Sequence, residues 1–404
     1  MKTMENDSKV IVGLDVGTSS IKVLAGVVKD GQISIVGVSE TPTSGMRKGV
    51  VSDMASLSKS IDEALGQVEK TTGYEINTAT VNINGSSIVS TKTDGMIVVA
   101  GQEINLDDLR RLEELATIGK IPDNRVILKV IPHDYILDGQ AGIKDPLGMT
   151  GSRLEIKANV ISTLTPHLDG LRRVASLAEV TPSRVIVSSE AAARAVLNEK
   201  QCENGVMLLE LGASTMGIAI YEGGDLQYLA VLPVGANNVT NDLALGLQID
   251  PELAEVVKLT RASAVFSDKT KKVSVKHNKQ TYEFDQADID EIVDMRLKEI
   301  FEMVNDKLHE SGYAGKLPSG VVLTGGGAKL AGIDNYVKNA LGLVTHIANC
   351  QHQFRGLSDK ITGPEYMTAV GLMLYDLEAY NTDQTTEPKA SGGLFGSLKK
   401  LFKK

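Results

Sequence analysis

The chain has 404 residues, of which 42% are hydrophobic and 23% are charged. This balance indicates a folded protein of about two or three domains and excludes a wholly disordered chain, a collagen-like fibre and a disulfide scaffold, because the only cysteines are Cys202 and Cys350. The formal net charge of −9 argues against nucleic-acid binding, although the last six residues hold four lysines and no acid.

The N-terminal part of the chain predicts three strands joined by short turns, then a helix and a fourth strand. Asp30-Gly31 is typical of a hairpin turn, and Asp53 is a typical N-cap for a helix whose apolar positions begin at Leu57. The strands are expected at residues 10–15, 21–28, 33–38 and around 81–83.

The same unit recurs 195 residues later, with Glu210 in register with Asp15 and Gly212 with Gly17. Its strands are expected at residues 206–212, 216–221 and 229–234, with a tight turn at 223–225. A match over three strands and two turns predicts two halves of similar topology.

Residues 88–163, between the two halves, predict a small α/β domain of their own. Its strands are expected at 96–99, 126–131 and 155–160 and its helix at 106–117. Beyond the second repeat, the sequence predicts a long helix over residues 285–310 and a strand over 321–324 that ends in three glycines.

Two turns in the repeats have the composition of phosphate-binding loops. Glycine allows close approach of backbone N–H groups to a phosphate, hydroxyls add donors, a lysine can neutralise charge, and an acid can hold Mg²⁺ through its waters. These features occur in the turn from Asp15 to Lys22 and again after Glu210. The alternative for each turn is an ordinary hairpin, and the alternative for the three glycines is a simple loop.

The order of Asp15-x-Gly-Thr, Leu211-Gly-Ala-Ser-Thr and Thr324-Gly-Gly-Gly resembles the actin/Hsp70/sugar-kinase superfamily. Within it, the chain resembles the FtsA family of bacterial division proteins over essentially its whole length. The motifs that carry the resemblance are residues 13–22, 131–138, 142–151, 237–247 and the C-terminal segment.

The resemblance implies an α/β, actin-like duplicated RNase H-like fold, with two lobes around a nucleotide cleft and a small α/β domain inserted in the first lobe. The implied divisions are 1–84 and 164–203 for the first lobe, 85–163 for the insert, 204–240 for the second-lobe core, 241–317 for its outer subdomain, 318–380 for the second-lobe core and the return to the first lobe, 381–393 for a flexible linker, and 394–404 for a membrane-targeting helix.

The resemblance also implies ATP and Mg²⁺ as ligands, with Asp15 and Glu210 holding the metal through water. The implied nucleotide-binding residues are Asp15, Gly17, Thr18, Ser19, Ser20, Lys22, Glu210, Gly212, Ala213, Ser214, Thr215, Gly235, Ala236, Asn237, Glu255, Lys258, Gly325, Gly326 and Gly327. Glu255 and Lys258 are spaced to share one helix face, and a surface ion pair is the alternative for them.

The second loop departs from the superfamily, which usually has Asp where this chain has Glu210. The extra methylene moves the carboxylate by about 1.5 Å, which disturbs the placement of an attacking water. Glu190 resembles a position from which some relatives assist hydrolysis, and a solvated acid at a helix start is its alternative. We therefore expect ATP binding with at most weak ATPase activity, for which Glu190 and Glu210 are the catalytic candidates.

The last eleven residues predict an amphipathic helix, because their large apolar side chains fall on one helix face. The apolar residues are Leu394, Phe395, Leu398, Leu401 and Phe402, and Lys399, Lys400, Lys403 and Lys404 accompany them. This pattern is typical of a helix that binds anionic membrane lipid, and docking on the protein's own body is the alternative. The first nine residues lack the apolar core of a secretion signal, so we expect the cytoplasmic face of the membrane.

The resemblance implies a polymerising adaptor that tethers FtsZ filaments to the membrane at the division site and recruits later division proteins. The FtsZ C-terminal tail is expected on the outer subdomain, where Arg296 is the candidate contact; pairing within its own helix, for example with Glu299, is the alternative. A pilus-assembly adaptor or a small-molecule kinase of the same fold are the other functions considered.

Overall fold

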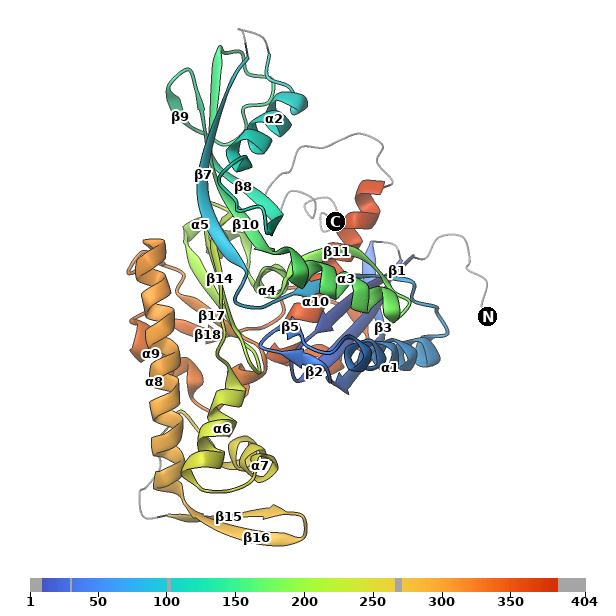
Figure 1. Cartoon of the computed structure of the whole chain (residues 1–404), viewed down its shortest axis with the longest axis vertical. Coiled ribbons are helices and arrows are strands. Elements are labelled where there is room, and N and C mark those ends of the chain that lie inside the picture. The colour runs from blue at the N-terminus through green and yellow to red at the C-terminus, as the bar shows by residue number, and fades with distance from the viewer. Residues whose placement is uncertain (1–8, 30, 100–102, 266–270, 384–404) are drawn as a thin grey trace.

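The computed structural model describes residues 9–29, 31–99, 103–265 and 271–383. The predicted amphipathic helix at 394–404 and the linker beyond residue 383 lie outside these ranges. Figure 1 shows an elongated molecule in which the insert and the outer subdomain project from opposite ends of a central pair of sheets. The fold is mixed α/β, as expected from the sequence.

The first lobe is built on a six-stranded sheet with the strand order β11-β6-β1-β2-β3-β19. Helices α1 and α3 pack against each other, and α10 packs against β1. Asp53 caps α1 as predicted, since its side chain accepts hydrogen bonds from the N–H groups of Ala55 and Ser56. The elements are β1 (Lys9–Val16), β2 (Ser20–Lys29), β3 (Gln32–Pro42), α1 (Met54–Thr72), β6 (Thr78–Ile83), α3 (Thr165–Leu177), β11 (Thr181–Val187), β19 (Arg355–Gly356) and α10 (Met367–Asp383).

The second lobe repeats the β1–β2–β3 meander as β12–β13–β14 within a nine-stranded sheet, whose order is β18-β17-β12-β13-β14-β7-β10-β8-β9. Asp15 pairs with Lys22 across β1–β2, and Glu210 pairs with Gly217 across β12–β13, so the register of the repeat is the same in both lobes. These strands are β12 (Val206–Leu211), β13 (Met216–Glu222), β14 (Asp225–Leu232), β17 (Val321–Thr324) and β18 (Thr345–Ile347).

The insert continues the second-lobe sheet through a single pairing of Ala230 with Val89. It has its own small core, in which Leu112 of α2 packs with Leu154 and Ile156 of β10. The helix predicted at 106–117 is confirmed, but β8 runs past Pro132, because a bulge at His133 lets the pairing with β10 resume. The elements are β7 (Val89–Val98), α2 (Leu106–Thr117), β8 (Arg125–Leu137), β9 (Gln140–Ile143) and β10 (Arg153–Leu164).

In the outer subdomain, α6 and β16 contact the long helix α8, whose predicted position is confirmed, and α7 packs against α6 and β15. Its elements are α6 (Ala236–Gly246), α7 (Pro251–Arg261), β15 (Lys272–His277), β16 (Gln280–Asp285) and α8 (Gln286–Ser311), and α9 (Ile333–Leu341) lies against α8.

Two connections differ from the sequence-based expectation or add to it. The linker does not begin at residue 381, because α10 continues to Asp383. A short hairpin, β4 (Met46–Arg47) and β5 (Val50–Val51), was not predicted, since each strand has only two residues and no apolar alternation marks it. Among the described residues, no helix is long and apolar enough to cross a membrane.

Candidate functional site

The two candidate phosphate loops adopt the same turn. The N–H of Gly17 donates to the carbonyl oxygen of Ser20 at 3.2 Å, and the N–H of Gly212 donates to that of Thr215 at 2.9 Å. Each loop joins the first two strands of a meander, and each follows an acidic residue near the end of its first strand. The repeat seen in the sequence is therefore a repeat of backbone hydrogen bonding.

Asp15 is held at the start of the first loop by Asn82 of β6. The Asn82 side-chain amide donates to Asp15 Oδ1 at 2.8 Å and to Ser188 Oγ at 3.0 Å, while its oxygen accepts from the N–H of Val16. Burial raises the pKa of the Asp15 carboxyl to about 6, and Lys22 opposes the rise. Asn82 therefore fixes the position of the Asp15 carboxyl group, while burial disfavours its charged form.

Lys22 does not stand free in the first loop. Its Nζ lies 3.3 Å from Glu40 Oε1 of β3 and donates to Ser20 Oγ at 2.7 Å. Tyr366 supports this pair, because its hydroxyl donates to Glu40 Oε2 at 2.9 Å and its ring lies 5.8 Å from Lys22 Nζ. The lysine expected to neutralise phosphate is therefore already balanced by a carboxylate.

Glu210, the second acid, is held by helix α10, which follows the second lobe in the chain. The Thr368 hydroxyl donates to Glu210 Oε1 at 2.6 Å, whereas Glu210 Oε2 is buried without a hydrogen-bond partner among the described residues. Burial raises the pKa of Glu210 to about 7, and the charge of Asp15 adds to the rise. The effect of Asp15 on Glu210 indicates that the two buried acids, one from each lobe, lie near enough to interact electrostatically.

Gly217 has no side chain, which leaves room for the Glu210 side chain opposite it. A Cβ atom at this position would lie 3.1 Å from Glu210 Oε2 and 2.9 Å from Ser189 Cβ. Ser189 Oγ is also buried without a partner among the residues described. Glu210 Oε2 and Ser189 Oγ are thus two buried oxygens without partners among the described residues, and oxygen atoms are the ligands that Mg²⁺ prefers.

The remaining predicted segments gather on the second loop. Ala236 and Asn237 donate their N–H groups to the carbonyl oxygens of Gly212 and Ala213, at 2.9 and 2.7 Å. A Cβ atom at Gly235 would lie 2.6 Å from the Gly212 oxygen, so only glycine fits there. Ser19 is exposed, and Ser214 is partly exposed.

Glu255 and Lys258 form the ion pair that was their alternative, at 2.6 Å, but Lys258 is only 12% exposed in its side chain. Thr240 of α6 bridges them, since it donates to Glu255 at 2.6 Å and accepts from Lys258 at 2.8 Å. Lys258 Nζ also reaches the carbonyl oxygen of Ala236 at 3.5 Å. The pair therefore lies beside the Gly235–Asn237 segment.

The three glycines have two different roles. Gly325 has a φ of 86°, and a Cβ there would lie 2.5 Å from the Leu211 oxygen, while one at Gly327 would strike the Leu211 side chain. Gly326 alone borders open space. The absence of side chains at the outer two positions is thus required by packing on the second loop, and only the middle glycine can face a ligand.

Glu190 is not a solvated acid. It is 3% exposed, its carboxylate lies 2.5 Å from Lys129 Nζ of the insert, and the hydroxyl of Tyr375 donates to it at 3.1 Å. In the described structure these contacts hold the carboxylate on helix α4 (Ser188–Val196) toward the insert and α10, and none joins it to either loop. Glu190 therefore ties the insert to the central helices.

Arg296 is paired within its own subdomain. It reaches Asp242 of α6 at 2.5 Å and Glu299 at 2.6 Å, which confirms the intrahelical alternative and adds a link between α6 and α8. The Asp242 carboxylate raises the pKa of the guanidinium.

Four residues that the sequence analysis missed complete the site: Asn82, Glu40, Tyr366 and Thr368. A buried Asn inside the apolar segment Val81-Asn82-Ile83 was a usable signal, because an unpaired amide is costly in a core. Thr368 carried no such signal, since it lies more than 150 residues from Glu210 along the chain.

A family model described as the SHS2 domain inserted in FtsA matches residues 85–162, and one described as the cell division protein FtsA matches residues 207–371. The FtsA of Pseudomonas aeruginosa is 33% identical over 92% of this chain and 90% of its own length. That of Escherichia coli K12 is 30% identical over 98% of this chain and 97% of its own length.

Solved structures with the same fold share little sequence. The chain of a PilM–PilN type IV pilus biogenesis complex superposes with a TM-score of 0.68 at 16% identity, covering 91% of this chain and 98% of its own. MreB5 of Spiroplasma citri bound to ADP gives 0.56 at 14% identity, with coverages of 93% and 99%. These likenesses establish an actin-like fold.

Proposed function

Because the chain belongs to the FtsA family of cell division proteins, we propose that it is an ATP-binding, actin-like adaptor. It polymerises on the cytoplasmic face of the membrane at the division site, tethers FtsZ filaments there and recruits later division proteins. The observation that supports the nucleotide part is the pair of turns with the same backbone hydrogen bond, which follow Asp15 in one lobe and Glu210 in the other.

The site favours binding of ATP with Mg²⁺ over its turnover. Asp15 and Glu210 would hold the metal through water, and a bound metal would neutralise phosphate charge. The two loops supply backbone N–H groups and hydroxyls for the phosphates, and Gly326 offers an open backbone for the adenosine. Glu190 is engaged by Lys129 and Tyr375 and has no contact with either loop among the described residues, which disfavours a role for it in positioning an attacking water.

The outer subdomain has a surface that suits a peptide with both apolar and acidic side chains. Leu245 of α6 and Met295 of α8 are 78% and 66% exposed, on the two helices that the Arg296–Asp242 ion pair joins. We assign the FtsZ C-terminal tail to this surface. An acidic residue of the tail would compete with Asp242 and Glu299 for the guanidinium.

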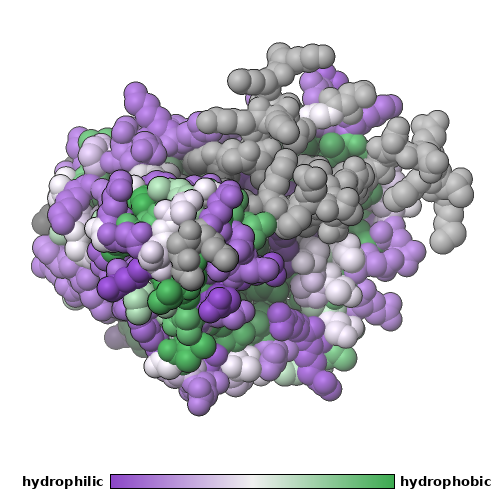
Figure 2. Space-filling model, turned by 90° about the horizontal axis from the view of Figure 1, so that it is seen from above, coloured by the Kyte–Doolittle hydropathy of each residue, from purple (hydrophilic) through white to green (hydrophobic). Residues whose placement is uncertain are grey.

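The insert is suited to contacts with other proteins, including further copies of this chain. Residues 90–98 of β7 pair only with β10 among the described strands, so they present an open sheet edge. Figure 2 looks onto this end of the molecule and shows an apolar area bordered by hydrophilic side chains. The exposed apolar residues of the insert include Met96, Val98, Leu115 and Ile118.

Residues 394–404, whose sequence predicts an amphipathic helix, are the proposed membrane anchor. Burial of its five large apolar side chains is largely offset by the entropy of ordering the segment, and each lysine near anionic lipid adds about 1 kcal/mol. A single copy would therefore bind reversibly. Polymerisation joins many such helices, so attachment becomes stable only in the assembled state.

Co-sedimentation with anionic liposomes tests the anchor. The double variant Leu398→Asp, Phe402→Asp is expected to stay in the supernatant while binding ATP like the unmodified chain. Leu259→Asp is the matched control, because Leu259 is 73% exposed on α7 and its change removes the same kind of side chain elsewhere. Liposome binding by the double variant equal to that of the control would contradict the assignment.

A further inference from the structure

The tip of the β4–β5 hairpin is a strained turn that reaches the junction of the two lobes. Arg47 pairs with Val50, so the turn consists only of Lys48 and Gly49, with φ values of 49° and 76°. Both positive values define the two-residue turn in which glycine or asparagine is favoured. A lysine with its Cβ is disfavoured at the first position, so the backbone alone does not call for this residue.

The hairpin tip is wedged between the two phosphate loops. The N–H of Gly49 donates to Thr18 Oγ1 of the first loop at 3.3 Å. On its other side, a Cβ atom at Gly49 would lie 3.1 Å from Thr215 Cγ2 of the second loop and 2.9 Å from the N atom of Gly85. Asn84, beside Gly85, donates its side-chain amide to Thr215 Oγ1 at 3.2 Å. The turn therefore touches both loops.

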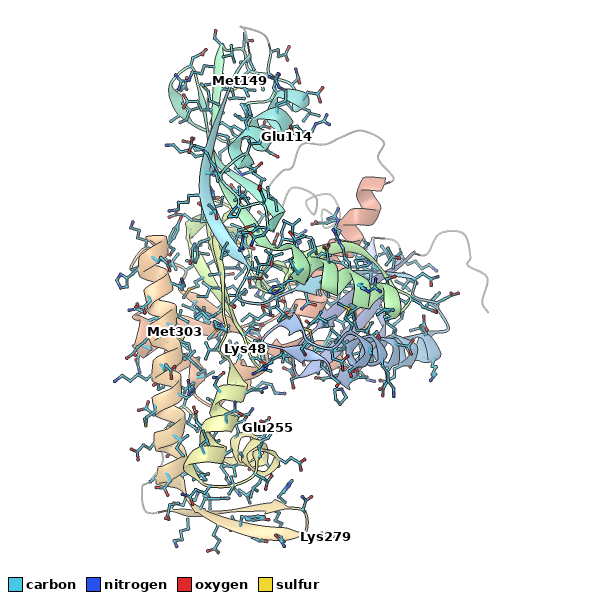
Figure 3. All side chains as sticks on the ribbon, viewed as in Figure 1. Lys48, Glu114, Met149, Glu255, Lys279 and Met303 are labelled. Carbon is cyan, nitrogen blue, oxygen red and sulfur yellow. The ribbon has the colours of Figure 1, made fainter. Side chains whose placement is uncertain are left out.

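The charges around the loops leave a role for one more cation. Asp15, Glu210 and Glu40 are negative when ionised, and Lys22 is already paired with Glu40. Lys48 is exposed and forms no ion pair within the described part of the chain. Figure 3 shows Lys48 where the first lobe meets the second, just above the start of α6. It is an exposed cation adjacent to Gly49, the residue that touches both loops.

We propose that Lys48 binds the terminal phosphate of a bound nucleoside triphosphate and makes the site distinguish triphosphate from diphosphate. The inference rests on the nucleotide binding proposed above. The terminal phosphate is the group that a diphosphate lacks, and a lysine adjacent to Gly49, which touches both loops, would meet it as a point charge on a flexible stem. The same contact would bring the β4–β5 hairpin against the ligand, so the triphosphate would contact both lobes.

The test compares ATP and ADP binding to the full chain with Mg²⁺ present, by titration calorimetry. Lys48→Gly removes the charge and suits the positive φ, so the turn itself should be retained or improved. We expect it to weaken ATP binding about tenfold and ADP binding less than about twofold, the size of one charge-assisted contact. Lys48→Arg keeps the charge and should recover most of the preference for ATP.

Lys279→Gly is the matched control. Lys279 occupies the same kind of two-residue turn, between β15 and β16, with a φ of 64°, and it lies at the far end of the outer subdomain (Figure 3). It should leave both affinities unchanged. If the unmodified chain binds ATP and Lys48→Gly retains its ATP-to-ADP ratio, the role of Lys48 is overturned while the nucleotide site stands. If the unmodified chain binds neither nucleotide, the proposed function itself fails.

Discussion

The two loops share one backbone but differ in how their acids are held. In the first loop, Asp15 is fixed by Asn82 of the same lobe, and the position across the hairpin is a lysine. In the second loop, Glu210 is fixed by Thr368 of the return helix, and the position across the hairpin is Gly217. The first lobe therefore places two acids around one lysine, whereas the second holds a single acid opposite a glycine.

The difference shows that, in a duplicated fold, two turns with the same backbone hydrogen bond can have acids with different surroundings. The longer side chain at Glu210 is accommodated because Gly217 leaves its position empty, and Thr368 occupies only one of the two carboxylate oxygens. The second oxygen is buried and has no hydrogen-bond partner among the described residues. Since Thr368 lies on α10, which packs on the first lobe, the second acid also depends on how the two lobes meet.

The largest expected effect concerns the pH dependence of stability in metal-free buffer. The pKa of Glu210 is raised from 4.5 to about 7, so between these values the folded chain keeps a proton that the unfolded chain has lost. Stability should therefore fall as the pH rises from 5 to 8, with Glu210 contributing on the order of 3 kcal/mol. Glu210→Gln cannot titrate and should flatten this fall in urea unfolding. Equal slopes for both proteins would place the carboxylate in solvent.

The next effect concerns the first acid. Asp15→Ala should weaken Mg²⁺-dependent ATP binding by about 10–100-fold, the usual range for loss of a group that holds a metal, and filament formation should weaken with it. Asp62→Ala, at an exposed position on α1, is the control. Calorimetric titration and electron microscopy on lipid monolayers measure the two effects. Undiminished filaments with Asp15→Ala would mean that assembly does not depend on this site.

The smallest effect concerns Gly217 on β13, the position opposite Glu210. Gly217→Ala should destabilise the chain by about 1–2 kcal/mol, because its Cβ would press on Glu210 Oε2 and Ser189. Gly66→Ala, on α1 with no atom within 4 Å of the new Cβ, should be neutral or stabilising. Thermal unfolding of the two variants side by side measures the difference. A Gly217→Ala protein as stable as Gly66→Ala would show that the space is not tightly bounded.

Much of the local structure was predictable because it depends on short-range patterns. The repeat of Asp15 and Gly17 as Glu210 and Gly212 was visible in the sequence, and the two turns share the same hydrogen bond. The helix at residues 106–117 and the long helix α8 followed from apolar periodicity. A strand, a helix cap or an amphipathic helix is specified by residues that lie close together in the sequence.

Only the tertiary structure revealed which charges remain available. The sequence showed that Lys22, Glu190 and Arg296 are charged. It did not show that these residues form ion pairs with Glu40, Lys129 and Asp242, respectively, which lie on other strands and helices. Electrostatic energy depends on distance and burial, and both are set by segments far apart in sequence. The sequence therefore determined where the loops are, and packing between the lobes decided which of their groups can meet a ligand.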